Sequence, residues 1–327
     1  MKPIAFVLAC SVGCAGAQEM STLKLTRTIP LPGVKGRFDH FAVDVKGRRL
    51  FVAALGNNTL EVLDVAGSKR LKTISGLSKP TGVLYLAGSN RIGVANGDEG
   101  GFKLFNGATY ALVKTVASLE DADNVRYDRK ADAIYVGYGA GALGSIDAGS
   151  GRKSGSIKLP GHPESFQLEQ GGNRVFVNVP DAGQVVVIDR QRGNVAATWP
   201  MGEFKANFPM ALDEAHGRLF IGCRRPARLL VLDAASGKRV EDLAISGDTD
   251  DLFYDAGRKL IYLSCGEGVI DVIEQQDADH YRTRERVATA AGARTSLFSA
   301  ELDEFYLAVP QRGDRPAEIR IYRPGHS

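Results

Sequence analysis

The sequence predicts an all-β fold, a seven-bladed β-propeller with four-stranded blades. Three observations indicate this fold: short segments alternate apolar and polar residues, these segments come in groups of about four, and the groups recur every 41 to 44 residues along the 327-residue chain. A repeat of this length with four strands is typical of a propeller blade. Solenoids of helix pairs have similar periods, but the helical periodicity they require is missing from this sequence.

The first repeat shows the pattern, with strands expected at 41–44, 50–53, 60–64 and 71–74. The residue that ends the first strand recurs seven times, at Asp44, Tyr85, Asp128, Glu169, Asp213, Asp255 and Ser299. The third strands are the clearest markers, as in 185–189 and 229–233, and each of these two ends in Asp. We expect the closing Asp to accept hydrogen bonds from the backbone of the following turn.

The end of the chain predicts how the ring closes. After the third strand of the last blade, 318–322, only five residues remain, which is too few for a fourth strand. Residues 23–29 resemble the outer strand at 70–74 and are expected to join the last blade in its place. Such closure removes the exposed sheet edge that an open propeller would present.

The first 17 residues are expected to be a signal peptide. Lys2 is followed by a short apolar run at 4–12 and by Ala15-Gly16-Ala17, a small-x-small cleavage pattern. The alternative is a lipoprotein signal acylated at Cys10 or Cys14. Cleavage after Ala17 leaves a single propeller domain at 18–327 in the periplasm or secreted, and no later apolar run is long enough for a transmembrane segment.

Charge indicates which partners to expect. Lys plus Arg number 41 against 38 for Asp plus Glu, a formal net charge of +3, and the basic residues are scattered. A nucleic-acid-binding protein usually carries a concentrated basic patch, so no nucleic acid is expected. The chain is expected to be a monomer or to associate weakly.

The repeat resembles the YVTN-type seven-bladed propeller family of exported bacterial proteins over about residues 23–324. The matching segments are Val94-Ala95-Asn96, Phe176-Val177-Asn178 and Val185–Asp189, whereas later blades replace the Asn with Cys223, Cys265 and Pro310. The resemblance implies a rigid periplasmic or cell-surface binding or assembly module. Lactonases and quinoprotein amine dehydrogenase subunits are its distant architectural relatives.

The residues just before each first strand are the candidate site. In a propeller these positions from every blade converge around one mouth of the central channel. The candidate ligand-binding residues are Asp39, His40, Asp123, Asn124, His162, Glu164, Asp250, Asp251 and Arg294.

The candidate residues around the channel mouth could have several roles. Its oxygens could hold a hard cation such as Ca²⁺, or His40 and the carboxylates could hold a metal that activates water. It could instead grip a polar or cationic ligand or a loop of a partner protein, and polar residues at strand starts could also simply be solvated. The favoured interpretation is a binding or scaffold protein without cofactor or catalytic residues. The alternative is a lactonase-like metal-dependent hydrolase.

Two further features of the sequence could carry chemistry: a glycine-rich motif and a pair of cysteines. Gly139 to Gly144 fits a dinucleotide-binding GxGxxG pattern, but a strand rather than a helix is expected next, so we interpret it as a turn. Cys223 and Cys265 occupy equivalent positions in adjacent blades. They could form a cross-blade disulfide, remain as two half-buried thiols, or contribute to a soft-metal site.

Overall fold

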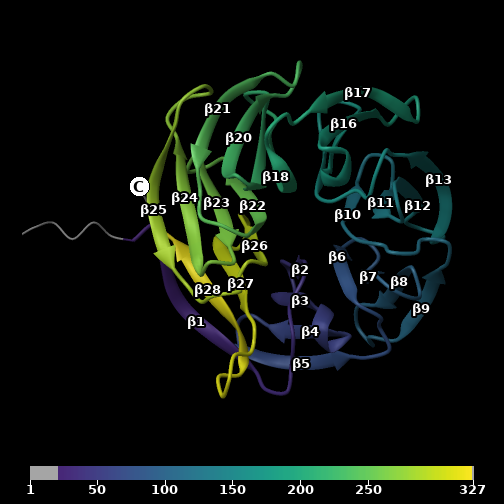
Figure 1. The fold of residues 1–327 in the computed structure, drawn as a ribbon. Coiled ribbons are helices and arrows are strands. Elements are labelled where there is room, and N and C mark those ends of the chain that lie inside the picture. The colour runs from purple at the N-terminus through teal and green to yellow at the C-terminus, as the bar shows by residue number, and fades with distance from the viewer. Residues whose placement is uncertain (1–20, 326–327) are drawn as a thin grey trace, which may run out of the picture.

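A computed structural model describes residues 21–325. The predicted signal peptide at 1–17 lies outside these residues. The described chain forms seven antiparallel four-stranded sheets arranged in a ring, which confirms the predicted seven-bladed propeller (Figure 1). Two short 3₁₀ helices, η1 (Leu55–Asn57) and η2 (Pro180–Ala182), interrupt the strands. Among the described residues, no helix has the length and apolar character needed to cross a bilayer.

Each blade contributes one strand to each of four concentric positions. The first strands contact one another around the centre and are β2 (Phe41–Asp44), β6 (Pro80–Leu86), β10 (Val125–Asp128), β14 (Phe166–Leu168), β18 (Lys205–Asp213), β22 (Thr249–Asp255) and β26 (Ser296–Ser299). The second strands are β3 (Arg49–Ala54), β7 (Arg91–Asn96), β11 (Ala133–Tyr138), β15 (Arg174–Val179), β19 (Arg218–Arg225), β23 (Leu260–Cys265) and β27 (Glu304–Val309).

The outer half of the ring completes the blades. The third strands are β4 (Thr59–Asp64), β8 (Phe102–Asn106), β12 (Ala142–Asp147), β16 (Gln184–Asp189), β20 (Ala227–Asp233), β24 (Val269–Gln275) and β28 (Ala317–Pro324). The outermost strands are β5 (Lys69–Ile74), β9 (Leu112–Val116), β13 (Arg152–Lys158), β17 (Asn194–Pro200), β21 (Arg239–Ala244), β25 (Tyr281–Ala288) and β1 (Leu23–Leu31).

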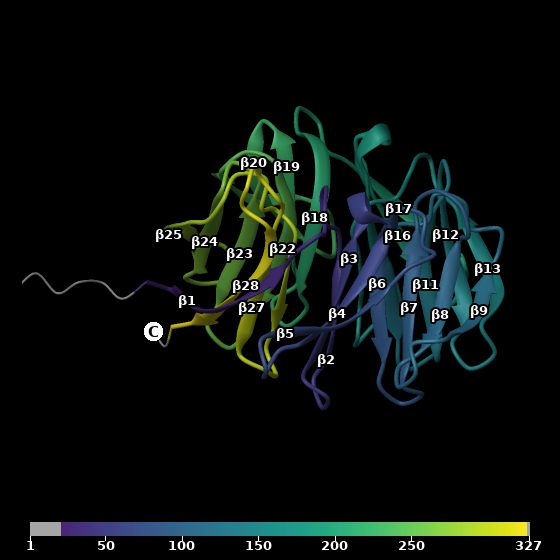
Figure 2. The same cartoon turned by 90° about the horizontal axis from the view of Figure 1, so that it is seen from below.

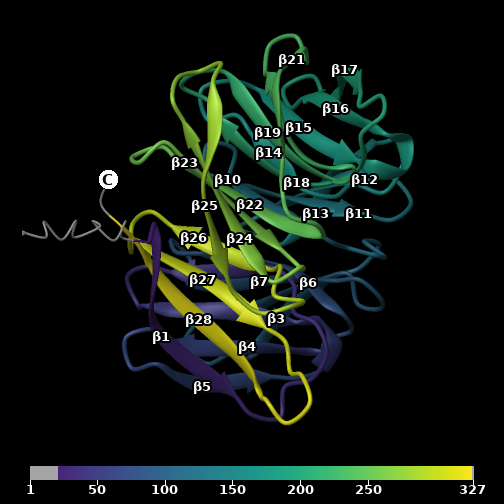
Figure 3. The same ribbon diagram turned by 60° about the vertical axis from the view of Figure 1, so that its left-hand side comes forward.

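The N-terminal strand closes the ring, as the sequence predicts. β1 pairs antiparallel with β28 and becomes the outer strand of the last blade, and Figures 1 and 3 both show purple β1 beside yellow β28. Ile29 and Leu31 are fully buried and pack with Ile319 between the last blade and the first. The observed strand continues two residues past the predicted end at residue 29.

The apolar core lies between the blades rather than at the centre. Seven buried clusters occur in the described chain, one at each contact between neighbouring blades. Strand residues alternate between the two faces of a sheet, and both faces of the middle strands are covered. This explains why β3 and β15 are nearly continuous apolar runs, with five of six residues buried in each.

Turn residues behave as the sequence indicates. The Oδ1 atom of Asp233 accepts hydrogen bonds from the backbone N–H groups of Ala235 and Ser236, and Asp64 does the same for Gly67. The glycine-rich segment forms a tight turn between β11 and β12, with no helix after it. The interpretation of this segment as a turn is therefore confirmed.

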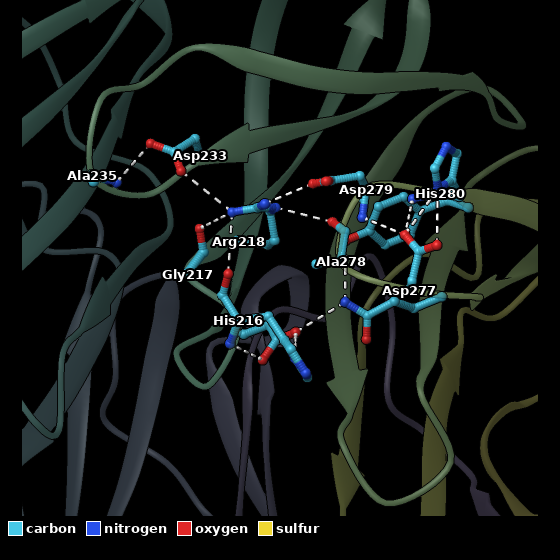
Figure 4. Close-up of polar contacts among 12 residues, drawn as sticks. His216, Gly217, Arg218, Asp233, Ala235, Asp277, Ala278, Asp279 and His280 are labelled. Atoms are coloured by element: carbon cyan, nitrogen blue, oxygen red, sulfur yellow. Dashed lines mark hydrogen bonds and ion pairs between the residues drawn. The ribbon is translucent and has the colours of Figure 1, made fainter.

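Arginines link neighbouring blades on the face of the ring where the second strands begin; Figure 2 shows the ring of blades edge-on. Each side chain donates to a carbonyl at the end of the third strand of the next blade. The pairs are Arg49 to Gly107, Arg91 to Gly149, Arg174 to Ala234, Arg218 to Ala278 and Arg258 to Gly325. Figure 4 shows the Arg218 link together with its ion pairs to Asp233 and Asp279.

Cys223 and Cys265 are both buried, free thiols, so the structure does not contain the possible disulfide. Cys223 packs between the fourth and fifth blades and Cys265 between the fifth and sixth. Because the two residues are equivalent, each faces the preceding blade, and the sheet of the fifth blade separates them. Burial raises the pKa of the Cys223 thiol to about 12.

Truncation of Ile29 should test the closing strand. Ile29→Ala removes a fully buried side chain and should lower the free energy of unfolding by about 2–5 kcal/mol in urea denaturation. Leu25→Ala in the same strand is the matched control, because Leu25 is 47% exposed and its truncation should change stability by less than about 0.5 kcal/mol. Equal effects of the two variants would contradict the closing role of β1.

The thiols should react only when the protein unfolds. A chain that starts at Gln18 should gain no N-ethylmaleimide adduct while folded and two adducts in denaturant without reductant, as read by intact mass. A requirement for reductant would show that Cys223 and Cys265 are disulfide-bonded.

Candidate functional site

Backbone pairing fixes three acidic residues at equivalent positions. The N–H groups of Asp39, Asp123 and Glu164 donate to carbonyls at the ends of the second strands of their own blades, at 2.8–2.9 Å. In each case the carbonyl of the following residue accepts a hydrogen bond from the same second strand, as the His40 carbonyl does from the Ala53 N–H. The three carboxylates therefore project from the same level of the first, third and fourth blades.

These residues meet at one end of the central channel, which we call the mouth. A cavity of about 110 Å³ lies there, lined by residues from six of the seven blades. Of the predicted site residues, it is lined by Asp39, His40, Asp123, Asn124, Glu164, Asp250 and Arg294. His162 lies behind Asp123, and Asp251 lies deeper, on a larger channel cavity of about 620 Å³ that also touches His40.

One side of the mouth combines histidines with carboxylates. We call Asp39, His40, Asp123, His162 and Glu164 the histidine half. His40 Nε2 lies 3.4 Å from Asp39 Oδ1, and His162 Nε2 lies 3.6 Å from Asp123 Oδ2. Possible ligand atoms lie within 4.8 Å of one another in two groups, Asp39–His40–Asp123 and Asp123–His162–Glu164, so these residues could hold a metal ion.

Each of these histidines has an acceptor on its other ring nitrogen. His162 Nδ1 lies 2.7 Å from the carbonyl oxygen of Gly139, which has φ +61° in the glycine-rich turn. His40 Nδ1 lies 3.5 Å from Asp251 Oδ1, and Oδ2 of the same carboxylate accepts from the Ser296 N–H at 2.7 Å. Both contacts leave Nε2 facing the carboxylates of the mouth.

Enclosure of several charges shifts the pKa of the carboxyl groups upward. Burial, followed by repulsion from Asp123, raises the pKa of Glu164 to about 8. Burial also raises the pKa of Asp39 to about 7, although His40 opposes the shift. The mouth therefore retains protons that exposed carboxyl groups would lose near pH 4.

The histidine pKa values also rise. A hydrogen bond to Asp123 raises the pKa of His162 to about 9. Burial alone would lower the pKa of His40, but the charge of Asp39 and the contact with Asp251 raise it to about 10. Both shifts show that this half of the mouth favours positive charge.

On the opposite side of the mouth, two arginines form ion pairs with carboxylates. We call Arg224, Asp248, Asp250 and Arg294 the arginine half. Asp250 pairs with Arg224 through Oδ1 and with Arg294 Nε through Oδ2, the latter at 3.1 Å. Both guanidinium groups also reach Asp248, at 3.4 Å from Arg224 and 2.6 Å from Arg294. Two cations thus neutralise two carboxylates, and the uncompensated acidity lies in the histidine half.

Arg224 was not among the predicted site residues. It follows Cys223 at the end of β19 and stacks 4.1 Å from the centre of the Phe208 ring. Its place at the end of a second strand is the signal that could have identified it, because second strands end where first strands begin. Arg126 was also missed. It lines the deeper channel, its guanidinium lies 5.5 Å from the Phe166 ring centre, and burial lowers its pKa.

Glu164→Gln should remove a pH-dependent cost of folding. The folded pKa of Glu164, about 8, lies above its ordinary value of 4.5, so its contribution is fully present below pH 4.5 and is lost as pH rises through 8. In buffer with a chelator, the variant and the wild type should be equally stable near pH 5. Near pH 8.5 the variant should be more stable by about 1 kcal/mol or more, since one pKa unit corresponds to about 1.4 kcal/mol.

Glu203→Gln, at an exposed position, is the control for this measurement and should show no such pH-dependent gain. A difference between wild type and Glu164→Gln that stays constant from pH 5 to 8.5 would contradict the assigned shift.

Comparison with known proteins supports the fold. No protein-family model and no curated protein matches the chain. The chain is similar to a solved structure entitled "Crystal Structure of Mitotic Checkpoint Complex", with a TM-score of 0.78, 14% identity and coverage of 99% of this chain and 98% of the other. It is also similar to "Kuenenia stuttgartiensis Hydrazine Synthase", with a TM-score of 0.75, 15% identity and coverage of 85% and 95%. At these identities the likeness shows the seven-bladed β-propeller fold alone.

Proposed function

We propose that this protein is a binding protein that takes a positively charged ligand at the mouth of its channel. The observation that carries the proposal is the convergence of Asp39, Asp123 and Glu164 beside a small cavity, with no arginine or lysine paired to Asp123 or Glu164 among residues 21–325. Three confined carboxylates repel one another unless a cation joins them.

The contrast between the two halves supports a cationic ligand. In the arginine half the protein supplies its own counter-charges, in the form of Arg224 and Arg294. In the histidine half Arg37 lies 3.6 Å from Asp39, but Asp123 and Glu164 have only imidazoles and retained protons to compensate them. A ligand that brings positive charge can replace those protons, whether it is a free cation or a basic group of a partner.

The proposed setting is outside the cytoplasm. The pattern at residues 2–17 supports export to the periplasm or the medium, with cleavage after Ala17. A place among the YVTN-type propellers is part of the same proposal. Asn178, at the second-strand position typical of that family, donates through Nδ2 to the Phe208 carbonyl of the next blade at 3.0 Å.

A metal-dependent hydrolase of the lactonase kind is the second candidate. The two histidine–carboxylate groups favour it, because a metal held there would polarise an ester carbonyl and a nearby carboxylate would act as base. Hydrolysis of a γ-lactone, followed with a pH indicator and lost in Asp123→Asn, would favour this candidate over simple binding.

A thermal-shift panel tests the binding function. The probes are putrescine, spermidine, arginine, Ca²⁺ and Zn²⁺, with glucose and citrate as neutral and anionic comparisons. At least one cation should raise the melting temperature of the wild type by several degrees, because a ligand at 100 times its Kd contributes about 2.7 kcal/mol. Asp123→Asn should abolish that shift.

Asp181→Asn is the matched control, since Asp181 is an exposed carboxylate on the same face, in η2. It removes the same charge and should leave the shift intact. The proposal fails when no cation shifts the melting temperature, or when the shift survives Asp123→Asn.

A further inference from the structure

We infer that the histidine half of the mouth is a binding site for a single divalent transition-metal ion, with Zn²⁺ as its representative. The inference rests on the proposed function, because it specifies which cation the mouth takes. The ligands are His40 and His162 through Nε2, with carboxylate oxygens of Asp39, Asp123 and Glu164.

The spacing of the donor atoms fits such an ion. Two ligands at about 2.0–2.1 Å from a tetrahedral zinc lie about 3.3 Å apart. The observed separations are 3.4 Å from His40 Nε2 to Asp39 Oδ1 and 3.6 Å from His162 Nε2 to Asp123 Oδ2. No group contains both histidines, but Asp123 belongs to each group, so an ion beside Asp123 would draw His40 and His162 toward it from the two sides.

The contacts behind both histidines are those of metal ligands. A ligating histidine usually donates its second ring N–H to a carbonyl or carboxylate, which fixes the tautomer and aims the other nitrogen at the metal. The Gly139 carbonyl serves His162, and Asp251 serves His40. Asp251 is itself buried and held by the Ser296 N–H, so this support is part of the packed channel wall.

Glu164 gives an independent indication of a missing partner. Its side chain is half-buried and lines the mouth cavity, yet it makes no side-chain hydrogen bond or ion pair to any residue in the described range. A carboxylate that loses part of its hydration without gaining a partner is costly, so such groups are often paired or bound to a metal. The nearest possible ligand atoms are those of Asp123 and His162, with which Glu164 forms one group.

The donor set selects the class of metal. Ca²⁺ and Mg²⁺ prefer six or more oxygen ligands, whereas two imidazole nitrogens with carboxylates suit zinc and its first-row neighbours. The sulfur atoms play no part, because Cys223 and Cys265 lie in the apolar clusters between blades. The site therefore differs from the calcium site considered as an alternative from the sequence.

Isothermal titration with Zn²⁺ tests the inference. The protein is prepared without an affinity tag, treated with EDTA and returned to chelator-free buffer. The wild type should bind one Zn²⁺ per chain with a Kd in the micromolar range or below, and Ca²⁺ at least about 100-fold more weakly. His40→Ala, His162→Ala and Glu164→Gln should each weaken Zn²⁺ binding at least about tenfold, and Asp251→Asn by about 10–100-fold.

His280→Ala is the matched control. His280 also contacts a carboxylate, with Nδ1 2.9 Å from Asp277, but it is exposed on a turn of the arginine-linked face, as Figure 4 shows. This substitution should leave Zn²⁺ binding unchanged. Glu164→Gln is nearly isosteric and keeps the test valid if a histidine variant does not fold. The visible spectrum of bound Co²⁺ gives a second readout, which Asp251→Asn should alter.

Three results would overturn the inference: no Zn²⁺ binding by the wild type, binding that persists in both His40→Ala and His162→Ala, or tighter binding of Ca²⁺ than of Zn²⁺. If Zn²⁺ fails to bind while an amine still raises the melting temperature through Asp123, the metal site is wrong and the proposed function stands. If every cation fails, both are wrong.

Discussion

The pairing of β1 with β28 is the constraint on which the rest of the structure depends. Each blade is a sheet with apolar residues on both faces, and such a sheet is stable only when a neighbour covers each face. In an open row of seven blades, the two outermost faces would remain uncovered. The N-terminal strand joins the ends of the row, and the cluster around Ile29 and Ile319 then becomes equivalent to the other contacts between blades.

Closure also determines the electrostatics of the mouth. Residues far apart in the sequence, such as His40 and Asp251, face each other only because the first and sixth blades are held on the same ring. The walls are packed protein, so charges placed there interact through a medium less polarisable than water. Enclosure raises the pKa of Glu164 directly, whereas the pKa of His40 is high because enclosure places Asp39 and Asp251 beside it.

Much of this arrangement could be predicted from the sequence, because it depends on period and alternation. The number of blades, the closing strand and the convergence of Asp39, Asp123 and Glu164 follow from counting along the repeat. Counting does not predict that Asp250 lines the mouth while Asp251 lies deeper in the channel, because this difference depends on a register irregularity between Thr249 and Asp251. The same holds for His162, whose orientation is set by a carbonyl of the preceding blade.

The possible disulfide between Cys223 and Cys265 shows a second limit of reasoning from the repeat alone. Equivalent positions in adjacent blades look close in a repeat diagram, but equivalence also means that the two side chains point in the same direction around the ring. Cys223 and Cys265 therefore face different neighbours. Repeat symmetry brings residues together near the axis and keeps them apart in the body of the blades.

The arginine links join neighbouring blades on the face opposite the mouth. The turns on that face are bound to one another through these links, so a substitution of a linking arginine affects the contact with the neighbouring blade. Under the proposed function, the residues that would bind the ligand lie at the other end of the channel from these five links, so a substitution among them leaves the links intact.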